Sequence, residues 1–389
     1  MISKRVANLP GFSIDRVAAA TGDDPEVLRL ENMDTDVPPS DVAIEATKAA
    51  VGLDETNSYL PFTGTLELRT AVSDHLHRQT GYRYDPETEV VITSGIGNAI
   101  LDAFLATVDP GDEVILTDPT YAGIICRARL AGAIPKLFPF DLDGDGRLDL
   151  DALEASVSSR TRAMLIASPA FPSCLVLNHE EWEAIATVCR ERSIWLLYNA
   201  AMERILFDGR PYIHPATLEG MRDHTITVGG VTKEQRMIGW RIGWAVGPAE
   251  IMRGIGQVHI YNGLTPGGIA QAGAYAALTA PNEAEDLAKC VAEWQKRRDA
   301  MLEQLQGMPV VPAEGGWCML MNVQKMGFST ASEVSRLVLE KGKVAATPMT
   351  YWGEKNSEQF LRLVFSNEPV QRLADLRERF DRALSSSLP

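Results

Sequence analysis

The sequence predicts an α/β fold in which a mostly parallel sheet is covered by helices. Two observations support this prediction. Short apolar runs, typical of strands buried on both faces, alternate along the chain with segments that have apolar residues at helical spacing. The chain has 389 residues, of which 45% are hydrophobic and 23% charged, and this size allows a large core and two domains.

The expected elements follow one another without an internal repeat, a low-complexity tract or a long linker. The strands predicted for the main sheet are 89–93, 113–117, 163–167, 194–198 and 225–228. A helical pattern over 180–189 lies between two of them. Later, a helix over 331–339 leads into apolar runs at 344–346 and 360–365. We expect a large domain over 46–289 and a smaller α+β domain built from 1–45 and 290–389.

Composition excludes several classes of protein. The net charge of -15 argues against a nucleic-acid or anionic-membrane partner, because binding many phosphates needs a basic face. The first residues lack an apolar signal core, and no run approaches the roughly eighteen apolar residues of a membrane span. We therefore expect a cytoplasmic protein. An odd number of cysteines without CxxC spacing predicts neither a disulfide framework nor a metal site: Cys126, Cys174, Cys189, Cys290 and Cys318.

The segment 232–243 gives the clearest indication of a chemical function. Lys233 follows the apolar strand 225–228, and Arg241 stands eight residues later in Gly-Trp-Arg-x-Gly. A lysine amine can form an imine with an aldehyde cofactor, and an arginine fork can bind that cofactor's phosphate. This pattern predicts pyridoxal 5'-phosphate (PLP). The segment resembles the lysine and arginine motif of class I and II aminotransferases, which have PLP fold type I.

The resemblance extends over roughly residues 30–380 and implies further cofactor contacts. The turn after strand 89–93 contains Gly95, Ile96 and Gly97, where backbone N–H groups at a helix start can approach the phosphate. Tyr121 stands in a Pro-x-Tyr motif whose ring stacks on the cofactor in that family. Tyr59 matches the tyrosine that reaches the phosphate of the neighbouring subunit, which implies a homodimer.

Substrate contacts are also implied. In the strand 360–365, Arg362 matches the arginine that holds the substrate α-carboxylate, for which a planar fork is well suited. An apolar or aromatic substrate side chain is suggested by a group of large residues in segments that line the pocket of such enzymes: Met33, Phe171, Met202, Trp317, Tyr351 and Trp352. A second arginine for a dicarboxylate could come from Arg204 or Arg236 if either turned inward.

Three departures fall on cofactor positions. Where the family has Asp-x-x-Tyr, this sequence has Asn199 and Met202, so the ring nitrogen lacks an anionic partner and the ring oxygen lacks a hydroxyl donor. Phe171 replaces the asparagine of Asn-Pro-Thr-Gly, which removes a second contact to that oxygen. Gly230 replaces a phosphate-binding serine, for which Thr232 could compensate.

These residues leave three hypotheses. The first is an aminotransferase in which Lys233 carries PLP and moves the proton during transfer between an amino acid and a 2-oxo acid. The second is a PLP enzyme of the same fold with a changed reaction, such as elimination, cyclisation, decarboxylation or oxidative deamination, with Asn199 tuning the ring. The third is a weakened or regulatory PLP-binding protein.

Overall fold

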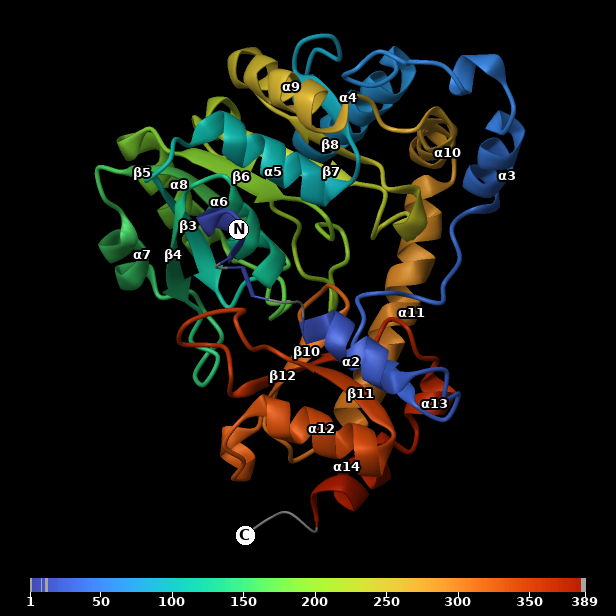
Figure 1. The fold of residues 1–389 in the computed structure, drawn as a ribbon, viewed down its shortest axis with the longest axis vertical. Helices are drawn as coiled ribbons and strands as arrows, with labels where there is room; N and C mark the ends of the chain where they lie inside the picture. Colours follow the sequence, from blue (N-terminus) through green and yellow to red (C-terminus); the bar gives the residue numbers. More distant parts are fainter. Residues whose placement is uncertain (1, 8, 11–12, 386–389) are drawn as a thin grey trace.

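Two sheets organise the chain in the computed structural model, which describes residues 2–7, 9–10 and 13–385. Figure 1 shows a larger α/β body above a smaller one, with the long helix α11 (Glu283–Gln304) running from one to the other. The architecture confirms the predicted fold class, since a mostly parallel sheet with helices on its faces lies at the centre of the larger body.

The larger sheet has seven strands in the order β2-β8-β7-β6-β5-β3-β4. Their bounds are β2 (Val90–Thr93), β3 (Glu113–Asp118), β4 (Ile134–Pro139), β5 (Thr161–Ala167), β6 (Trp195–Asn199), β7 (Thr225–Gly230) and β8 (Gly243–Val246). Only β8 runs antiparallel to its neighbours, β2 and β7. The carboxyl ends of the other six strands therefore lie at one edge of the sheet, the edge at which parallel sheets bind ligands.

Five of these strands match the predicted runs, and two were missed. β4 is only partly buried and carries two prolines and a lysine, so it lacks the apolar run that marks the others. β8 is four residues long and begins inside the Gly-Trp-Arg-x-Gly motif, where the glycines conceal the strand pattern. Both misses come from short or partly exposed strands that do not alternate clearly.

Alternate residues of the central strands pack against helices on opposite faces of the larger sheet. Val114 and Leu116 of β3 join one apolar cluster, whereas Ile115 joins another on the far face. The helices and short α turns of this body are α3 (Asp41–Ala50), α4 (Leu66–Thr80), α5 (Ile96–Thr107), α6 (Ala122–Leu130), α7 (Leu150–Ser156), α8 (His179–Arg192), α9 (Ala249–Gly263) and α10 (Gly268–Thr279). Burial on both faces explains why the strands read as continuous apolar runs.

The start of α8 is fixed by its own sequence. The Asn178 side chain accepts a hydrogen bond from the backbone N–H of Glu181, and the Glu181 carboxylate accepts one from the backbone N–H of Asn178. This reciprocal pair satisfies two amide groups that a helix start otherwise leaves without partners. The predicted helix over 180–189 is therefore confirmed and extends further in both directions.

The smaller sheet has the strand order β1-β11-β12-β10-β9. Its strands are β1 (Leu28–Leu30), β9 (Val310–Val311), β10 (Cys318–Asn322), β11 (Val344–Pro348) and β12 (Phe360–Val364). β1 pairs in parallel with β11, so the N-terminal part of the chain joins its C-terminal part. The division into a domain over 46–289 and a smaller one over 1–45 and 290–389 stays a prediction, and part of the smaller domain lies outside the described residues.

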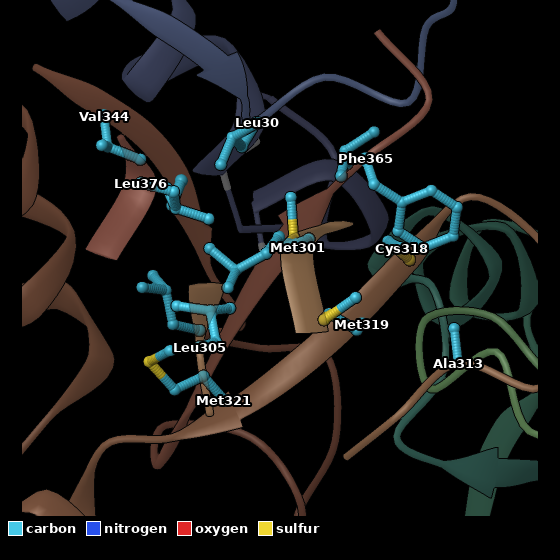
Figure 2. Packing of buried hydrophobic residues seen from close by; sticks show 14 of the residues in the cluster. Leu30, Met301, Leu305, Ala313, Cys318, Met319, Met321, Val344, Phe365 and Leu376 are labelled. Atoms are coloured by element: carbon cyan, nitrogen blue, oxygen red, sulfur yellow. The ribbon is translucent and has the colours of Figure 1, made fainter. Parts of the chain in front are cut away.

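Helices enclose one apolar core beside the smaller sheet. Figure 2 shows Leu30, Met301, Val344, Phe365 and Leu376 packing together from segments far apart in the sequence. The remaining helices are α1 (Lys4–Ala7), α2 (Ser13–Thr21), α12 (Ala331–Gly342), α13 (Val370–Leu373) and α14 (Leu376–Leu384), with short 3-10 turns at Asp54–Thr56, Pro215–Thr217, Met221–Asp223, Ile238–Trp240 and Gln324–Met326.

The described part of the chain contains neither a membrane-spanning helix nor a cluster of metal ligands. None of its helices combines the length and apolar character needed to cross a membrane. Within the same described residues, no three His, Cys, Asp or Glu side chains gather in a way that could hold a metal ion. All five cysteines are free thiols.

Candidate active site

A cavity of about 330 Å³ opens at the carboxyl edge of the larger sheet. The N-terminal segment, the ends of the parallel strands and β12 of the smaller sheet all contribute to its wall. Eleven of the predicted site residues line it: Met33, Ile96, Gly97, Tyr121, Phe171, Asn199, Met202, Thr232, Lys233, Arg241 and Arg362. Its volume suits a small organic ligand.

Lys233 lies in the loop that follows β7, and its side chain reaches into this cavity. Its Nζ donates a hydrogen bond to the carbonyl oxygen of Met33 at 2.5 Å and lies 4.6 Å from the ring centre of Trp317. Burial lowers the pKa of Lys233 to about 8, and the nearby charges of Arg362 and Arg241 act in the same direction, while Asp34 opposes them. About a tenth of this amine is thus neutral and nucleophilic at pH 7, far more than for an exposed lysine.

An anion cradle forms where α5 begins. Gly95 has φ +86°, and a Cβ atom there would lie only 2.7 Å from Nη2 of Arg241, so glycine allows the arginine to approach the helix start. The Oγ1 atom of Thr232 is buried without a hydrogen-bond partner and belongs to the same wall. Helix N–H groups, a guanidinium and a free hydroxyl together suit a phosphate.

Three aromatic rings form a second wall. The ring centres of Tyr121, Phe171 and Trp352 lie 5.4 to 5.6 Å from one another in tilted or edge-on geometry. Trp352 also donates to the Ser13 hydroxyl at 3.3 Å, which ties this wall to α2. Tyr121 and Phe171 line the cavity and Trp352 packs behind them, so this side is apolar, and the Phe171 side chain offers no polar atom where relatives of the predicted family have asparagine.

Asn199 ends β6 and faces the same cavity. Its Oδ1 accepts a hydrogen bond from the backbone N–H of Ala201 at 3.2 Å. The side-chain NH₂ can donate a hydrogen bond to a ligand, and the amide carries no negative charge. This position offers a ring nitrogen a hydrogen-bond donor in place of a negative charge.

Arg362 enters the cavity from β12 and is fully buried. Its Nη2 donates to the carbonyl oxygen of Glu31 and to the Thr347 hydroxyl, while its guanidinium lies 4.9 Å from the Trp352 ring centre and 5.5 Å from that of Phe171. Its Nε and Nη1 have no hydrogen-bond partner among the described residues. A buried cation with two free donor nitrogens is costly without an anion, so this geometry suits a carboxylate.

Five predicted residues do not line the cavity. Gly95 and Trp317 lie behind the lining residues: Gly95 is close to Arg241, and the Trp317 ring is close to Lys233. A side chain at Gly230 would meet the Ile242 carbonyl oxygen and Ile96, so the strand has no room for the serine of the family motif. Tyr59 is 83% exposed in the single chain. Tyr351 was expected beside the substrate but is 58% exposed, because the buried place belongs to its neighbour Trp352, 1% exposed.

Neither arginine left open for a dicarboxylate reaches the cavity. Arg204 pairs with Glu234 at 2.7 Å and with Glu283 at 2.6 Å. Arg236 pairs with Asp286 at 2.5 Å and donates to the carbonyl oxygens of two loops. Both are committed to ion pairs that hold the Lys233 loop against α11.

Several lining residues were not predicted: Ile14, Asn32, Ile100, Ile124, Arg127, Ala201 and Ile238. Arg127 carries the most chemistry among them. It lies six residues after Tyr121 and three after Ile124 on α6, and that helical spacing places Arg127 and Ile124 on one face. This spacing was the available signal, but it depended on knowing that α6 begins directly after Tyr121.

Comparison with known families decides what kind of site this is. The sequence profile described as aminotransferase class I and II matches residues 25–380. The chain belongs to this aminotransferase family. The match confirms the predicted family and, with it, PLP as the cofactor.

Individual aminotransferases agree over most of their length. The probable N-succinyldiaminopimelate aminotransferase of Mycobacterium tuberculosis is 32% identical over 365 residues, covering 89% of this chain and 91% of that protein. Aromatic-amino-acid aminotransferase 2 of Thermococcus litoralis is 28% identical, covering 84% of each. A solved structure of Thermus thermophilus aspartate aminotransferase with maleate has a TM-score of 0.91 and 27% identity, covering 99% of this chain and 100% of that one.

The residues present fit PLP at its two anchoring points. Lys233 supplies the buried amine, and the cradle of Gly95, Thr232 and Arg241 suits the phosphate. The fit is different around the ring, where Asn199, Phe171 and Met202 stand in place of the aminotransferase motif residues. The anchors of an aminotransferase are thus retained, while the polar contacts to the ring are reduced.

Proposed function

We propose that the protein transfers an amino group between an amino acid and a 2-oxo acid, with PLP bound to Lys233. One observation carries the proposal: the free nitrogens of buried Arg362 and the amine of Lys233 belong to one cavity. Arg362 supplies the carboxylate site that an amino acid requires, and Lys233 supplies the amine that an aldehyde cofactor requires.

Each residue has a defined task in this reaction. Bound PLP supplies an aldehyde and an electron-withdrawing ring. Arg362 holds the substrate α-carboxylate and so orients the Cα–H bond, while the Tyr121 ring lies on the apolar side of the cavity. The Lys233 amine, with its pKa lowered to about 8, is able to take a proton at Cα and return it elsewhere.

The substrate class and setting belong to the proposal as well. The relatives are named for an acylated diamino acid, for aromatic amino acids and for aspartate, so their names do not agree on one substrate. Tyr121, Phe171 and Met202 line the cavity, and these side chains support an apolar portion in the substrate side chain. We propose a cytoplasmic role in amino-acid metabolism and the two-domain division predicted above.

The absorbance of the PLP-loaded protein tests the function directly. Addition of a suitable amino acid, without an oxo acid, is expected to remove the absorbance of the aldehyde form, and a 2-oxo acid should restore it. A panel of amino acids and oxo acids would identify the reacting pair. If no amino acid changes the spectrum, or if the change cannot be reversed by any oxo acid, amino-group transfer is the wrong reaction.

A homodimer is supported by an exposed apolar surface around Tyr59. Tyr59 is 83% exposed and Tyr261 is 92% exposed, and Phe62 and Leu264, three residues further along the same two segments, are also exposed. The segments that carry them touch, because the Thr265 hydroxyl donates to the carbonyl oxygen of Pro61 at 3.3 Å. An apolar surface of this kind suits a second copy of the chain.

Replacing Tyr59 by phenylalanine is expected to weaken retention of PLP while leaving the dimer intact. The change removes one hydroxyl hydrogen bond to the phosphate of the partner's cofactor, worth ~1.5–3 kcal/mol. Equilibrium dialysis measures retention, sedimentation measures the oligomer, and Tyr82→Phe, with a ring beside Arg222, serves as the matched control. A fully active monomer would contradict the proposal.

A second candidate function follows from the ring contacts. Asn199, Phe171 and Met202 all line the cavity, so the departures at two of the family motifs meet the cofactor region together. An amide donor at Asn199 favours a ring nitrogen without a proton, which withdraws electrons less strongly. The same fold could then favour elimination, cyclisation, decarboxylation or oxidative deamination.

The variant Asn199→Asp separates the two candidates. In an aminotransferase, a carboxylate at this position is expected to favour the protonated ring nitrogen and to speed removal of the Cα proton by roughly tenfold, which is ~1.4 kcal/mol. Single-turnover measurements with an α-deuterated substrate report that step. If the variant loses its native reaction or gains transamination, the second candidate replaces the first.

A further inference from the structure

The cavity contains one more cationic side chain than the proposed reaction requires. Among the described residues that line it, Lys233, Arg241, Arg362 and Arg127 are cationic, and none is a carboxylate. In the proposed function, Lys233 binds the cofactor aldehyde, Arg241 binds the cofactor phosphate and Arg362 binds the substrate α-carboxylate. Arg127 has no assigned anion.

Arg127 is held in place by the backbone around it. Its Nε donates to the carbonyl oxygen of Gly97 at 2.7 Å, and its Nη1 donates to that of Gly123 at 2.9 Å. A Cβ atom at Gly97 would lie 2.6 Å from Nη2, and one at Gly123 would lie 2.8 Å from Nη1. Two glycines therefore make room for this guanidinium, whose position is fixed before any ligand arrives.

The hydrogen bonds leave one nitrogen for a ligand. Both hydrogen bonds described for the side chain go through Nε and Nη1 to carbonyl oxygens, which do not neutralise the charge. Among the described residues, none forms a hydrogen bond with Nη2, and the Arg127 side chain lines the cavity. A fixed, partly buried guanidinium of this kind binds an anion more strongly than a mobile surface arginine, because little side-chain entropy is lost.

The surroundings define what kind of anion would fit. Ile14, Ile96, Ile100 and Ile124 line the same cavity as Arg127. A ligand that fills this part of the cavity therefore contacts apolar side chains as well as the Arg127 guanidinium. Low polarity around the pair would strengthen the attraction.

We propose that Arg127 determines substrate specificity by binding a second anionic group, at the end of the substrate side chain. The substrate would then be an amino acid whose side chain joins an apolar stretch to a carboxylate. This inference rests on the proposed function, and it replaces a purely apolar substrate by one with a charged end. A structural role for Arg127, or a role in holding the cofactor phosphate, makes different predictions.

Equilibrium binding tests the proposal without relying on turnover. Calorimetry on the PLP-loaded protein compares glutarate with its monoamide, which has nearly the same shape and one charge fewer. The wild type is expected to bind glutarate at least roughly tenfold more tightly, and Arg127→Gln should reduce that preference to about threefold or less. Arg127→Lys should keep part of the preference, because it keeps the charge without the fork.

The exposed Arg129 on the same helix supplies a matched control. Arg129→Gln removes one positive charge from α6 at a position that does not line the cavity, and its preference should equal that of the wild type. Steady-state kinetics should repeat the pattern, with Arg127→Gln raising KM for glutamate and leaving that for glutamine unchanged.

Three results would overturn the assignment. Equal weakening of both ligands would show that Arg127 only supports the fold. Loss of PLP affinity without loss of preference would place the cofactor phosphate at Arg127. A wild type that does not prefer the dicarboxylate would remove the site altogether. If the wild type prefers glutarate to its monoamide but transfers no amino group, the proposed function is wrong. The assignment of an anion site to Arg127 is then still supported.

Discussion

Lys233→Ala is expected to abolish amino-group transfer, with a loss of roughly a thousandfold or more, equivalent to ~4 kcal/mol. The change removes the amine that binds the cofactor and the base that moves the proton. No other described lysine lines the cavity, so no amine is placed to substitute for it. Borohydride reduction of the wild type should fix PLP to Lys233, and the variant should yield no reduced adduct.

The pH dependence of cofactor capture gives this prediction a second readout. Because burial lowers the pKa of Lys233 to about 8, the amine is protonated below that pH and neutral above it. Only the neutral amine attacks an aldehyde, so the rate of PLP capture should rise through about pH 8. An exposed lysine would show the same rise near pH 10.4.

The matched control is Lys289→Ala on the exposed surface of α11, where the lysine pairs with Glu285. It should retain both activity and the reduced adduct on Lys233. Mass spectrometry that locates the adduct on another lysine would contradict the assignment, as would full activity of Lys233→Ala.

Arg362→Leu is expected to lower kcat/KM for amino acids by about a hundredfold or more, equivalent to ~3 kcal/mol. The loss should appear in both substrate affinity and kcat, because the guanidinium anchors the carboxylate and orients the reacting Cα–H bond. Arg362→Lys should recover only part of the activity, since a single ammonium cannot reproduce the planar fork. Activity with a simple amine should be much less affected.

Stability measurements distinguish this role from a structural one. Arg362 is buried with two nitrogens lacking partners, so its removal should leave the free energy of unfolding of the ligand-free protein unchanged or raise it. Arg297 is the contrasting control: it is also buried, but it pairs with Asp36 and Glu293 and donates to the carbonyl oxygen of Ser366. Arg297→Leu should therefore lower the free energy of unfolding.

Thermal unfolding with and without substrate, together with steady-state kinetics, checks both variants. Arg362→Leu should lose the stabilisation that a carboxylate ligand gives the wild type. If Arg362→Leu is as active as the wild type on amino acids, the α-carboxylate is bound elsewhere. If it unfolds far more easily, the guanidinium serves the fold and not the substrate.

The parts of the site that follow strands could be predicted from the sequence. Gly95, Tyr121, Asn199 and Lys233 each follow a run buried on both faces, and the parallel strands bring these ends to one edge. The fold class was predictable for the same reason. Short β8 and partly exposed β4 lacked that signal, because packing from neighbouring strands stabilises them more than their own pattern does.

Contacts between distant segments could not be read from local patterns. Tyr351 and Trp352 are adjacent in sequence, yet only Trp352 turns inward, because Ser13 and the Arg362 guanidinium meet its ring. Gly230 is required by the close approach of Ile242 and Ile96 across the sheet. Arg127 depends on two glycines in different helices. Each case involves at least one neighbour far away in the chain, which for Arg127 is Gly97.

The contrast between the cavity and the rest of the protein affects how substrates arrive. The chain as a whole carries a charge of -15, while the described wall of the cavity carries only cations. An anion diffusing at long range is therefore repelled, and it is attracted only after reaching the entrance. Since charges are screened beyond about 8 Å at physiological ionic strength, salt weakens the distant repulsion more than the attraction within the cavity. The cavity thus attracts anions only over short distances. Physiological salt reduces the long-range repulsion and so helps anionic substrates to reach the cavity.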